Sequence, residues 1–279
     1  NGLITVKPNV KYKEVLKKAA TDANIIKDAT CDFTPTGELT LTERILQPEE
    51  FQVNMELCKK DFRSDWEAVQ MGYSAYDNLP PNFSDFIIGH AAGLVAEKTE
   101  NNIWAGQTGN AGEFDGFYYL ATAGGSGCVS VSGSPLTAAN IIDEMGKVVD
   151  AIPSGVYGKE DLFIYVSRKA AKLYVRALGG FGANGLGAAG VNAQGTQWWN
   201  NGALSYDGVK VVIASGLPDD SMIAAQKSNL FFGTGLLSDH NEVKLLDMGD
   251  LDGSQNVRLV MRFTAGVQIG ITSDVVIYA

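Results

Sequence analysis

The sequence contains few of the residues that metal sites and disulfide frameworks need. Three of its 279 residues are cysteines and two are histidines. The cysteines, which are far apart and form no C-x-x-C pair, are Cys31, Cys58 and Cys128. Their spacing argues against a structural zinc site, and their odd number argues against a disulfide framework and favours a reducing compartment. No apolar run reaches the ~18 residues that a membrane span needs, and no signal peptide is visible.

Positive charge is also in deficit. The chain has 22 Lys and Arg against 32 Asp and Glu, which gives a formal net charge of -10. This argues against a protein that coats nucleic acid through a broad basic face, because such binding needs clustered cations. Residues 1–28 are the exception, with a local net charge of +3 from six lysines and three acidic residues; the lysines are Lys7, Lys11, Lys13, Lys17, Lys18 and Lys27. A basic arm suits pairing with another copy of an acidic body, and a solvated amphipathic helix is the alternative.

Catalytic signatures are likewise absent. The sequence has no G-x-S-x-G and no H-E-x-x-H motif. His90 falls inside a long predicted helix, where we expect it to be packed, and His240 falls in a turn, where we expect it to be exposed. The aspartate-rich run 247–253 lacks the glutamate that closes an EF-hand loop, so a turn between strands is preferred over a calcium site. The many carboxylates do not exclude an acid/base pair, but the sequence singles none out. We predict no catalytic, cofactor-binding or metal site, and no enzyme.

Glycine, by contrast, is abundant, above all in GGFGANGLGAAGVNAQG (Gly179–Gly195). This segment holds two overlapping G-x-G-x-x-G patterns, Gly180/Gly182/Gly185 and Gly185/Gly187/Gly190. A dinucleotide fingerprint needs a strand before it and a helix after it. Here a helix is predicted before it, and glycine this dense does not propagate a helix. We therefore predict a surface loop. The two indoles that follow, Trp198 and Trp199, would contact a partner or anchor the loop to the core.

Periodicity divides the chain into an α+β arrangement. Residues 3–28 form a helix-capable arm, and runs of period 2 at 38–46 and 51–58 predict the two arms of a hairpin. A spine helix is predicted over 83–106, at ~1.5 Å per residue ~33 Å long, and 112–123 reads as a loop entering a strand. An α/β region follows, with helices at 136–152 and 167–178 and strands at 161–166 and 209–214. The tail alternates strands and turns and predicts an antiparallel sheet without helices.

The order of these elements carries a resemblance. A basic arm, LTERILQP (Leu41–Pro48) in a hairpin, a spine helix ending in IWAG (Ile103–Gly106), the loop EFDGF (Glu113–Phe117) and a tail with LFFGTG (Leu230–Gly235) follow one another. In this order the chain resembles the major capsid protein of tailed bacteriophages, which has the Hong Kong 97-like fold. The resemblance covers the whole chain in element order, and its motifs are short.

The resemblance implies a division of the chain into domains. Residues 1–28 would be an N-terminal arm and 29–65 an extended hairpin lying over the adjacent subunit. The peripheral domain would comprise 66–119, with its spine helix, and 228–279. The axial domain would comprise 120–227, with the glycine-rich loop near the symmetry axes.

The resemblance also implies function and partners. The chain would be a structural protein that assembles through hexamers and pentamers into an icosahedral head in the host cytoplasm and encloses double-stranded DNA without sequence-specific binding. Portal, scaffold, protease and decoration proteins would be its other partners, and a maturation protease would create the N-terminus at Asn1. Candidate subunit contacts are Lys7, Lys11, Lys13, Lys17, Lys18, Leu41, Arg44, Ile45, Phe51, Trp198 and Trp199.

Two alternatives stay open. An encapsulin-like nanocompartment shell would share the fold and enclose a cargo enzyme. A nucleotide-binding oxidoreductase would use the Gly180–Gly190 loop.

Overall fold

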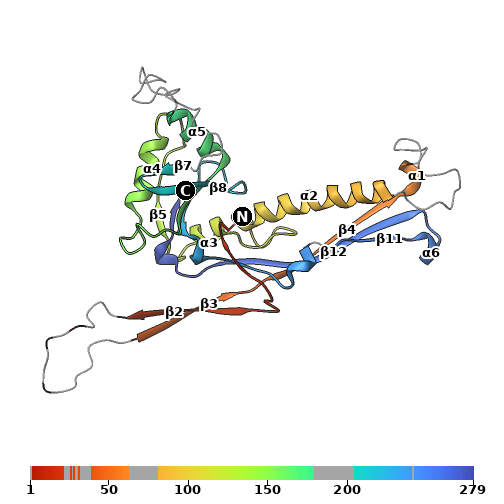
Figure 1. The fold of residues 1–279 in the computed structure, drawn as a ribbon, viewed down its shortest axis with the longest axis horizontal. Coiled ribbons are helices and arrows are strands. Elements are labelled where there is room, and N and C mark those ends of the chain that lie inside the picture. The colour runs from red at the N-terminus through yellow and green to blue at the C-terminus, as the bar shows by residue number, and fades with distance from the viewer. Residues whose placement is uncertain are drawn as a thin grey trace.

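The protein is an elongated molecule with a globular body at one end, a long helix lying on a sheet, and a projecting hairpin (Figure 1). The computed structural model describes residues 2–21, 26, 28, 31, 39–62, 81–178, 204–240 and 242–279. The glycine-rich segment 179–195, Trp198 and Trp199 lie outside the described residues.

The body is built on a six-stranded mixed sheet, which we call the body sheet. Its strands run in the order β5-β13-β9-β6-β8-β7. Their bounds are β5 Val129–Val131, β6 Leu162–Val166, β7 Leu204–Tyr206, β8 Val209–Ile213, β9 Met222–Gln226 and β13 Val276–Tyr278. Helices α4 (Ile141–Asp150) and α5 (Arg168–Leu178) cover one face, where they pack on Ile164 and Val166 of β6. The opposite face, with Tyr165, packs against the end of α2 and α3, so β6 is buried on both sides.

A second, five-stranded sheet, the tail sheet, extends away from the body. Its strands are β1 Thr5–Lys7, β4 Glu49–Cys58, β10 Leu230–Gly233, β11 Lys244–Asp247 and β12 Asn256–Ile269. The long β12 joins them, since it pairs antiparallel with β4, β10 and β11. Helix α2 (Pro81–Ala105) lies along this sheet, with Ile87 and Ala91 packed against Leu259.

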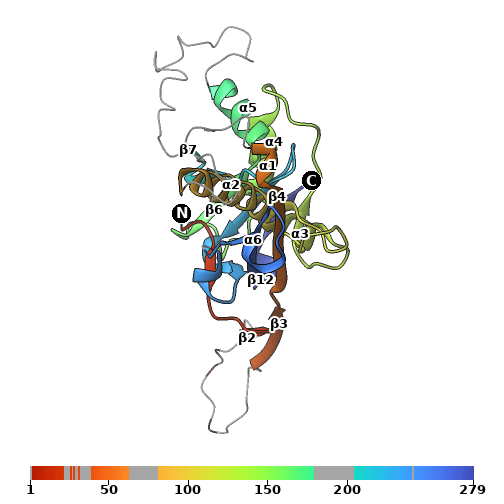
Figure 2. The same cartoon turned by 90° about the vertical axis from the view of Figure 1, so that its right-hand side faces the viewer.

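The third part is a two-stranded antiparallel hairpin made of β2 (Glu14–Thr21) and β3 (Leu39–Leu46). Figure 2 shows it projecting away from the rest of the molecule, opposite α5. The remaining elements are short: α1 Lys59–Phe62, α3 Phe117–Thr122, α6 Gly249–Asp252, and the 3-10 turns η2 Lys227–Asn229, η3 Leu237–His240 and η4 Thr272–Asp274.

Most predicted elements are confirmed, but the predicted hairpin pairing is wrong. The runs 38–46 and 51–58 are both strands, yet β3 pairs with β2, and β4 pairs with β12 over ten residues. A two-stranded ribbon alone buries little apolar surface, whereas β4 places Val53, Met55 and Leu57 against the α2 cluster. The chain therefore passes from the hairpin into the tail sheet at Gln47 and Pro48.

Two segments have a different secondary structure from that predicted. Glu14–Thr21, expected to be helical, is strand β2, because its eight residues pair in antiparallel register with Leu39–Leu46 of β3. Phe117–Thr122, expected to enter a strand, is helix α3, which buries Phe117 and Ala121 four residues apart on one face.

The tail is also more divided than predicted. Strands β10, β11 and β12 form the expected antiparallel pairs, but β13 leaves them and inserts between β5 and β9 of the body sheet. The short helix α6 interrupts the tail between β11 and β12. The C-terminus therefore lies in the body (Figure 1).

Candidate inter-subunit surfaces

The hairpin carries an apolar face that its own chain leaves uncovered. Val15 stands opposite Ile45 and Ala19 opposite Leu41, and paired residues of antiparallel strands share a face of the ribbon. The exposed fractions are 42% for Val15, 48% for Ile45 and 61% for Leu41. We call the surface formed by Val15, Ala19, Leu41 and Ile45 the outward face. Exposed apolar surface of this kind is suited to burial against another molecule.

An ion pair crosses the middle of the outward face. Lys17 Nζ lies 3.8 Å from Glu43 Oε1, and both side chains are more than half exposed, at 64% and 58%. An exposed pair of this kind contributes ~0–1 kcal/mol to stability. The pair therefore does more to fix strand register than to hold the hairpin together.

The opposite face of the hairpin turns toward its own chain. Leu46 is fully buried, and Gln268 Nε2 donates to the Ile45 carbonyl at 2.8 Å. Arg44 Nη2 donates to the Ser126 carbonyl at 3.1 Å. The base of the hairpin is thus attached to the tail sheet through Gln268 and to the body through Arg44, while its outward face stays in solvent.

The N-terminal segment is less free than predicted. Strand β1 pairs parallel with β10, and the Tyr165 hydroxyl donates to the Leu3 carbonyl at 2.5 Å. Beyond β1, the backbone of Asn9 and Val10 donates to Gly235 and Thr234. Residues 3–10 therefore belong to the chain's own tail sheet, because this edge of β10 accepts them. The predicted arm over 1–28 is thus attached to its own chain in this part.

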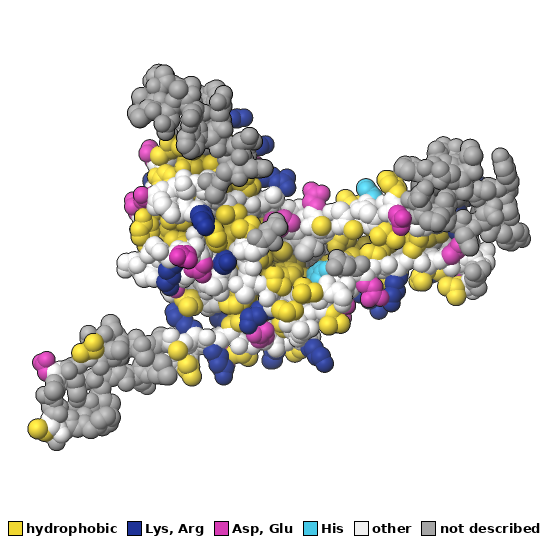
Figure 3. Space-filling view, viewed as in Figure 1, with side chains coloured by type: hydrophobic (Ala, Val, Ile, Leu, Met, Phe, Trp, Pro, Cys, Tyr) yellow, Lys and Arg dark blue, Asp and Glu magenta, His cyan; other side chains and the backbone are white. Residues whose placement is uncertain are grey.

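The predicted lysines divide into attached and exposed groups. Lys7 Nζ lies 2.9 Å from Glu14 Oε1 and 5.8 Å from the centre of the Phe231 ring, and Lys18 Nζ lies 3.5 Å from Ser273 Oγ. The exposed positions are Lys11, Lys13 and Lys17. In the view of Figure 3, basic side chains follow the hairpin and the lower edge of the molecule.

Phe51 occupies a position inside its own chain. Its ring lies 5.8 Å from the ring of Phe114 and 5.8 Å from that of Phe263. This packing does not support its prediction as a subunit contact.

Sequence reasoning missed two members of the outward face, Val15 and Ala19. They lie in the segment read as a helix, so their pairing with the other hairpin strand was not expected. A period-2 reading of EVLKKAAT (Glu14–Thr21) does not distinguish its two sides, because each carries two apolar residues and one lysine. Only the pairing with β3 identifies Val15 and Ala19.

Helix α2 has a second exposed apolar surface. Phe86 is 48% exposed and Leu94 51% exposed, and Gly89 and Gly93 lie between them along the helix. The sheet covers the stripe at Ile87 and Ala91 and leaves this side of the helix in solvent. His90, expected to be packed, is exposed for this reason.

His240, expected to be exposed, is partly buried. Its Nε2 lies 2.8 Å from Thr234 Oγ1, and its ring centre lies 5.0 Å from that of Phe263. Desolvation by burial lowers the pKa of the imidazole, against smaller opposing effects of a Thr264 hydrogen bond and Asp239. The tertiary packing of η3 against β12 produces this burial.

A shallow groove lies where the body meets α2, and Figure 3 shows hydrophobic side chains gathered there. Its volume is about 690 Å³, and its walls include Leu3, Ile103, Trp104 and Phe232. Glu100, on its rim, accepts a hydrogen bond from Trp104 Nε1 at 2.9 Å. Its lining also includes Ser215 and His240, and the imidazole of His240 lies at hydrogen-bond distance from Thr234.

The aspartate-rich run 247–253 forms the end of β11 and the turn α6. Asp247 is ion-paired with Lys59 and accepts a hydrogen bond from the Gly249 amide at 3.0 Å. Hydrogen bonding to Lys59 is the main cause of the lowered pKa of this carboxyl. In the described part of the chain, no three His, Cys, Asp or Glu side chains gather as metal ligands would.

None of the described helices has the length and apolar character of a membrane span.

Solved structures with this fold include chains of phages and the capsid of a GTA particle. The capsid of an empty GTA particle matches with a TM-score of 0.64 at 12% identity, over 99% of this chain and 87% of the other. A chain from Mycobacterium phage Adephagia matches with a TM-score of 0.64 at 13% identity, over 99% and 88%. The capsid of Myoviridae phage XM1 matches with a TM-score of 0.61 at 12% identity, over 99% and 89%.

No protein-family model matches the sequence, and no curated protein matches it either. At identities this low the structural matches establish the fold alone. The chain therefore has the mixed helix and sheet fold found in phage capsid structures, over essentially its whole length.

Proposed function

We propose that this chain is the major capsid protein of a tailed bacteriophage and that copies of it assemble into the closed shell that encloses the genome. The observation that carries the proposal is the fold shared with capsid structures over 99% of the chain, combined with a projecting hairpin whose outward face its own chain leaves uncovered.

The outward face supplies a driving force for assembly. Full burial of a Val, Leu or Ile side chain contributes about 1.5–3 kcal/mol, and the three large members of this face are only about half-exposed, so each would contribute part of that. One such contact is weak. In a closed shell every subunit gives and receives several contacts at once, and simultaneous engagement makes the assembly far tighter than any single pair.

The parts of the molecule take the following roles in this proposal. The hairpin of residues 14–46, rather than the predicted 29–65, is the extended loop that lies over the adjacent subunit. Helix α2 and the tail sheet form the peripheral domain. Residues 120–227, joined by β13, form the axial domain near the symmetry axes.

Charge and setting complete the proposal. The net charge of -10 per chain keeps the packaged DNA from adhering, because like charges repel across the inner surface. The chain assembles in the host cytoplasm and remains in the virion, with hexamers and pentamers as capsomers. Portal, scaffold, protease and decoration proteins are its expected partners, and the chain has no enzymatic role.

The outward face provides the test. Leu41→Glu and Ile45→Glu place a carboxylate where a neighbour would cover the hairpin, so we expect soluble, folded chains that no longer form particles. Leu251→Glu is the matched control, because Leu251 is 71% exposed and lies on α6, outside the hairpin. Negative-stain electron microscopy and sedimentation velocity measure the particles, and circular dichroism measures the fold.

Two results would contradict the proposal. A wild-type chain that stays monomeric at every concentration and salt tested would refute assembly. Particles that enclose a cargo enzyme in place of DNA would retain the shell and refute the phage assignment.

A further inference from the structure

The side of the hairpin that faces its own body contains two long cationic side chains. Lys18 lies on β2 and Arg44 on β3, and the register places both on the side opposite Val15 and Ile45. Both are half-buried, whereas their neighbours on the outward face are exposed. They therefore touch the molecule's own surface.

The acceptors for these two side chains come from segments that lead into the body sheet. Arg44 Nη2 donates to the Ser126 carbonyl at 3.1 Å and lies 3.4 Å from Thr272 Oγ1. Lys18 Nζ lies 3.5 Å from Ser273 Oγ. Ser126 precedes β5, and Thr272 and Ser273 form the turn η4 that precedes β13. Since β5 and β13 are paired strands of the body sheet, the contacts join the hairpin to the body.

This attachment differs from the covalent path of the chain. Through β3 and β4 the hairpin continues into the tail sheet, and the joint at Gln47 and Pro48 is held by the ladder of β4 with β12. The covalent path fixes where the hairpin begins. Its direction relative to the body is set by contacts beyond that joint. Gln268 of the tail sheet donates to the hairpin at its base, and the contacts of Lys18 and Arg44 are the ones that reach toward the body sheet.

The contacts are built from neutral acceptors. A carbonyl and two hydroxyls receive the cationic groups, and within the described residues no carboxylate lies at ion-pair distance from Lys18 or Arg44. Hydrogen bonds of this kind are individually modest because water competes for the donors. An attachment of this kind sets the direction of the hairpin. Its hydrogen bonds can break when the hairpin buries a larger apolar area against another surface.

We propose that Arg44, assisted by Lys18, is a positioning residue that holds the hairpin at a defined angle to the body sheet, so that the outward face is presented in one direction. Arg44 thus acts within its own chain. The consequence for shell geometry rests on the proposed function, and the positioning itself does not.

The positioning is tested on single chains by the distance between two spin labels. One label is placed at Lys17→Cys on the hairpin and one at Lys172→Cys on α5, in a chain whose native cysteines are replaced by serine: Cys31, Cys58 and Cys128. A large excess of unlabelled chain keeps labelled neighbours apart. With Arg44 present, we expect a distance distribution with one maximum. With Arg44→Ala, we expect that single maximum to be lost and the distribution to become broad.

Three further variants give the measurement its controls. Arg258→Ala removes a guanidinium that bonds Glu56 at 2.8 Å elsewhere in the chain, and it should keep the single maximum. Arg44→Lys should give an intermediate width, because an ammonium keeps the charge without the planar fork of donors. Thr272→Val removes one acceptor and should also broaden the distribution, which supplies the test if circular dichroism finds Arg44→Ala unfolded. A single, unshifted maximum in both Arg44→Ala and Thr272→Val overturns the proposal.

The consequence for assembly is read from electron micrographs of unlabelled chains. If Arg44 aims the hairpin, wild-type and Arg258→Ala chains give particles of uniform size, and Arg44→Ala gives open or heterogeneous particles. Uniform Arg44→Ala particles refute the consequence for assembly. Absence of particles from the wild-type chain refutes the proposed function and leaves the label result to decide the positioning.

Discussion

At the residue scale, Glu113 fixes the loop that follows α2. Its carboxylate is ion-paired with Lys98 and accepts hydrogen bonds from Asn110 Nδ2 at 3.0 Å and the Gln107 amide at 3.2 Å. Hydrogen bonding to Lys98 is the largest cause that lowers the pKa of Glu113 from 4.5 to about 2. One carboxylate thus organises the connection between α2 and α3.

We expect Glu113→Gln to lower the free energy of unfolding by about 1 kcal/mol, because it removes a charge-assisted hydrogen bond to Lys98. In this bond the Glu113 side chain is largely buried, whereas the Lys98 side chain is half-exposed to water. Since the pKa is depressed in the folded state, the stabilisation is present above pH 4.5 and is lost as the pH falls toward 2. Urea unfolding at pH 7 and at pH 3 measures it. The wild-type advantage should shrink at pH 3, and Glu97→Gln, at an exposed carboxylate on α2, is the control.

His240 gives a pH dependence in a different range. Burial lowers its pKa below the ordinary 6.5, so the unfolded chain binds a proton before the folded chain does as the pH falls. Stability contributed by the neutral imidazole is therefore complete above pH 6.5 and declines as the pH falls below it.

His240→Gln should flatten the decline of the melting temperature between pH 7.5 and pH 5.5. His90→Gln, which removes an exposed imidazole on α2, controls for general effects of losing a histidine. An unchanged slope in His240→Gln would show that other groups cause the decline.

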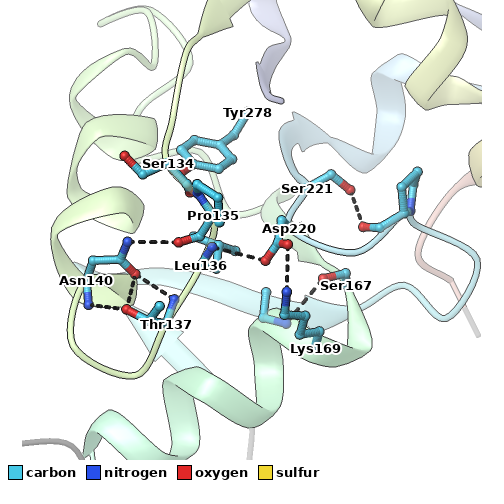
Figure 4. A network of polar contacts seen from close by, with 12 residues as sticks. Ser134, Pro135, Leu136, Thr137, Asn140, Ser167, Lys169, Asp220, Ser221 and Tyr278 are labelled. Carbon is cyan, nitrogen blue, oxygen red and sulfur yellow. Dashed lines mark hydrogen bonds and ion pairs between the residues drawn. The ribbon is translucent and has the colours of Figure 1, made fainter.

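At the scale of elements, β13 is secured in the body sheet by the loop that follows β5. The Tyr278 hydroxyl donates to the Ser134 carbonyl at 2.8 Å, and Asp220 receives the Leu136 amide at 3.0 Å and Lys169 Nζ at 2.6 Å (Figure 4). These contacts join the loop to β13 and to α5. The C-terminal strand is therefore an integral part of the body.

Gly133 in this loop is required for the close approach of Tyr278. A Cβ at position 133 would fall within the Tyr278 ring, so Gly133→Ala must displace the ring, at a cost of about 1–3 kcal/mol for overpacking. Gly124→Ala is the matched control, because a Cβ there meets no atom within 4 Å. Thermal unfolding should separate the two variants, and equal melting temperatures would contradict this account of β13.

The hairpin and β4 show what local pattern can predict about elements. Period-2 alternation predicted strands at 38–46 and 51–58, and the structure has them at Leu39–Leu46 and Glu49–Cys58. Their partners were mispredicted, because every strand edge offers the same backbone donors and acceptors. The burial of apolar side chains decides which strand edges pair. The residues that bury the apolar side chains of β4, such as Leu259, lie some two hundred residues further along the chain.

At the scale of the whole molecule, net charge opposes assembly. Each chain carries a formal charge of -10, and copies in a shell approach within the ~10 Å screening length of ~0.1 M salt. Exposed pairs such as Lys17 and Glu43 lie within one chain and do not offset the repulsion between chains.

We therefore expect the concentration at which particles first form to fall as sodium chloride rises from ~0.05 M to ~0.5 M, over which the screening length shortens several-fold. Light scattering at fixed pH measures this threshold. A threshold that rises with salt would contradict the expectation and would indicate that ion pairs between the lysine-rich segment and a neighbouring chain dominate.

The sequence by itself determined the mixed α+β character, the long helix, the two strands predicted at 38–46 and 51–58, and the scarcity of cysteine and histidine, because these follow from composition and from periodicities of two to four residues. Only the tertiary structure decided that β2 is a strand paired with β3, that β13 joins the body, that Phe51 and His240 turn inward, and that Arg44 touches its own chain. These outcomes depend on which segments, distant in the sequence, bury their apolar surfaces against one another. The local sequence does not specify that pairing.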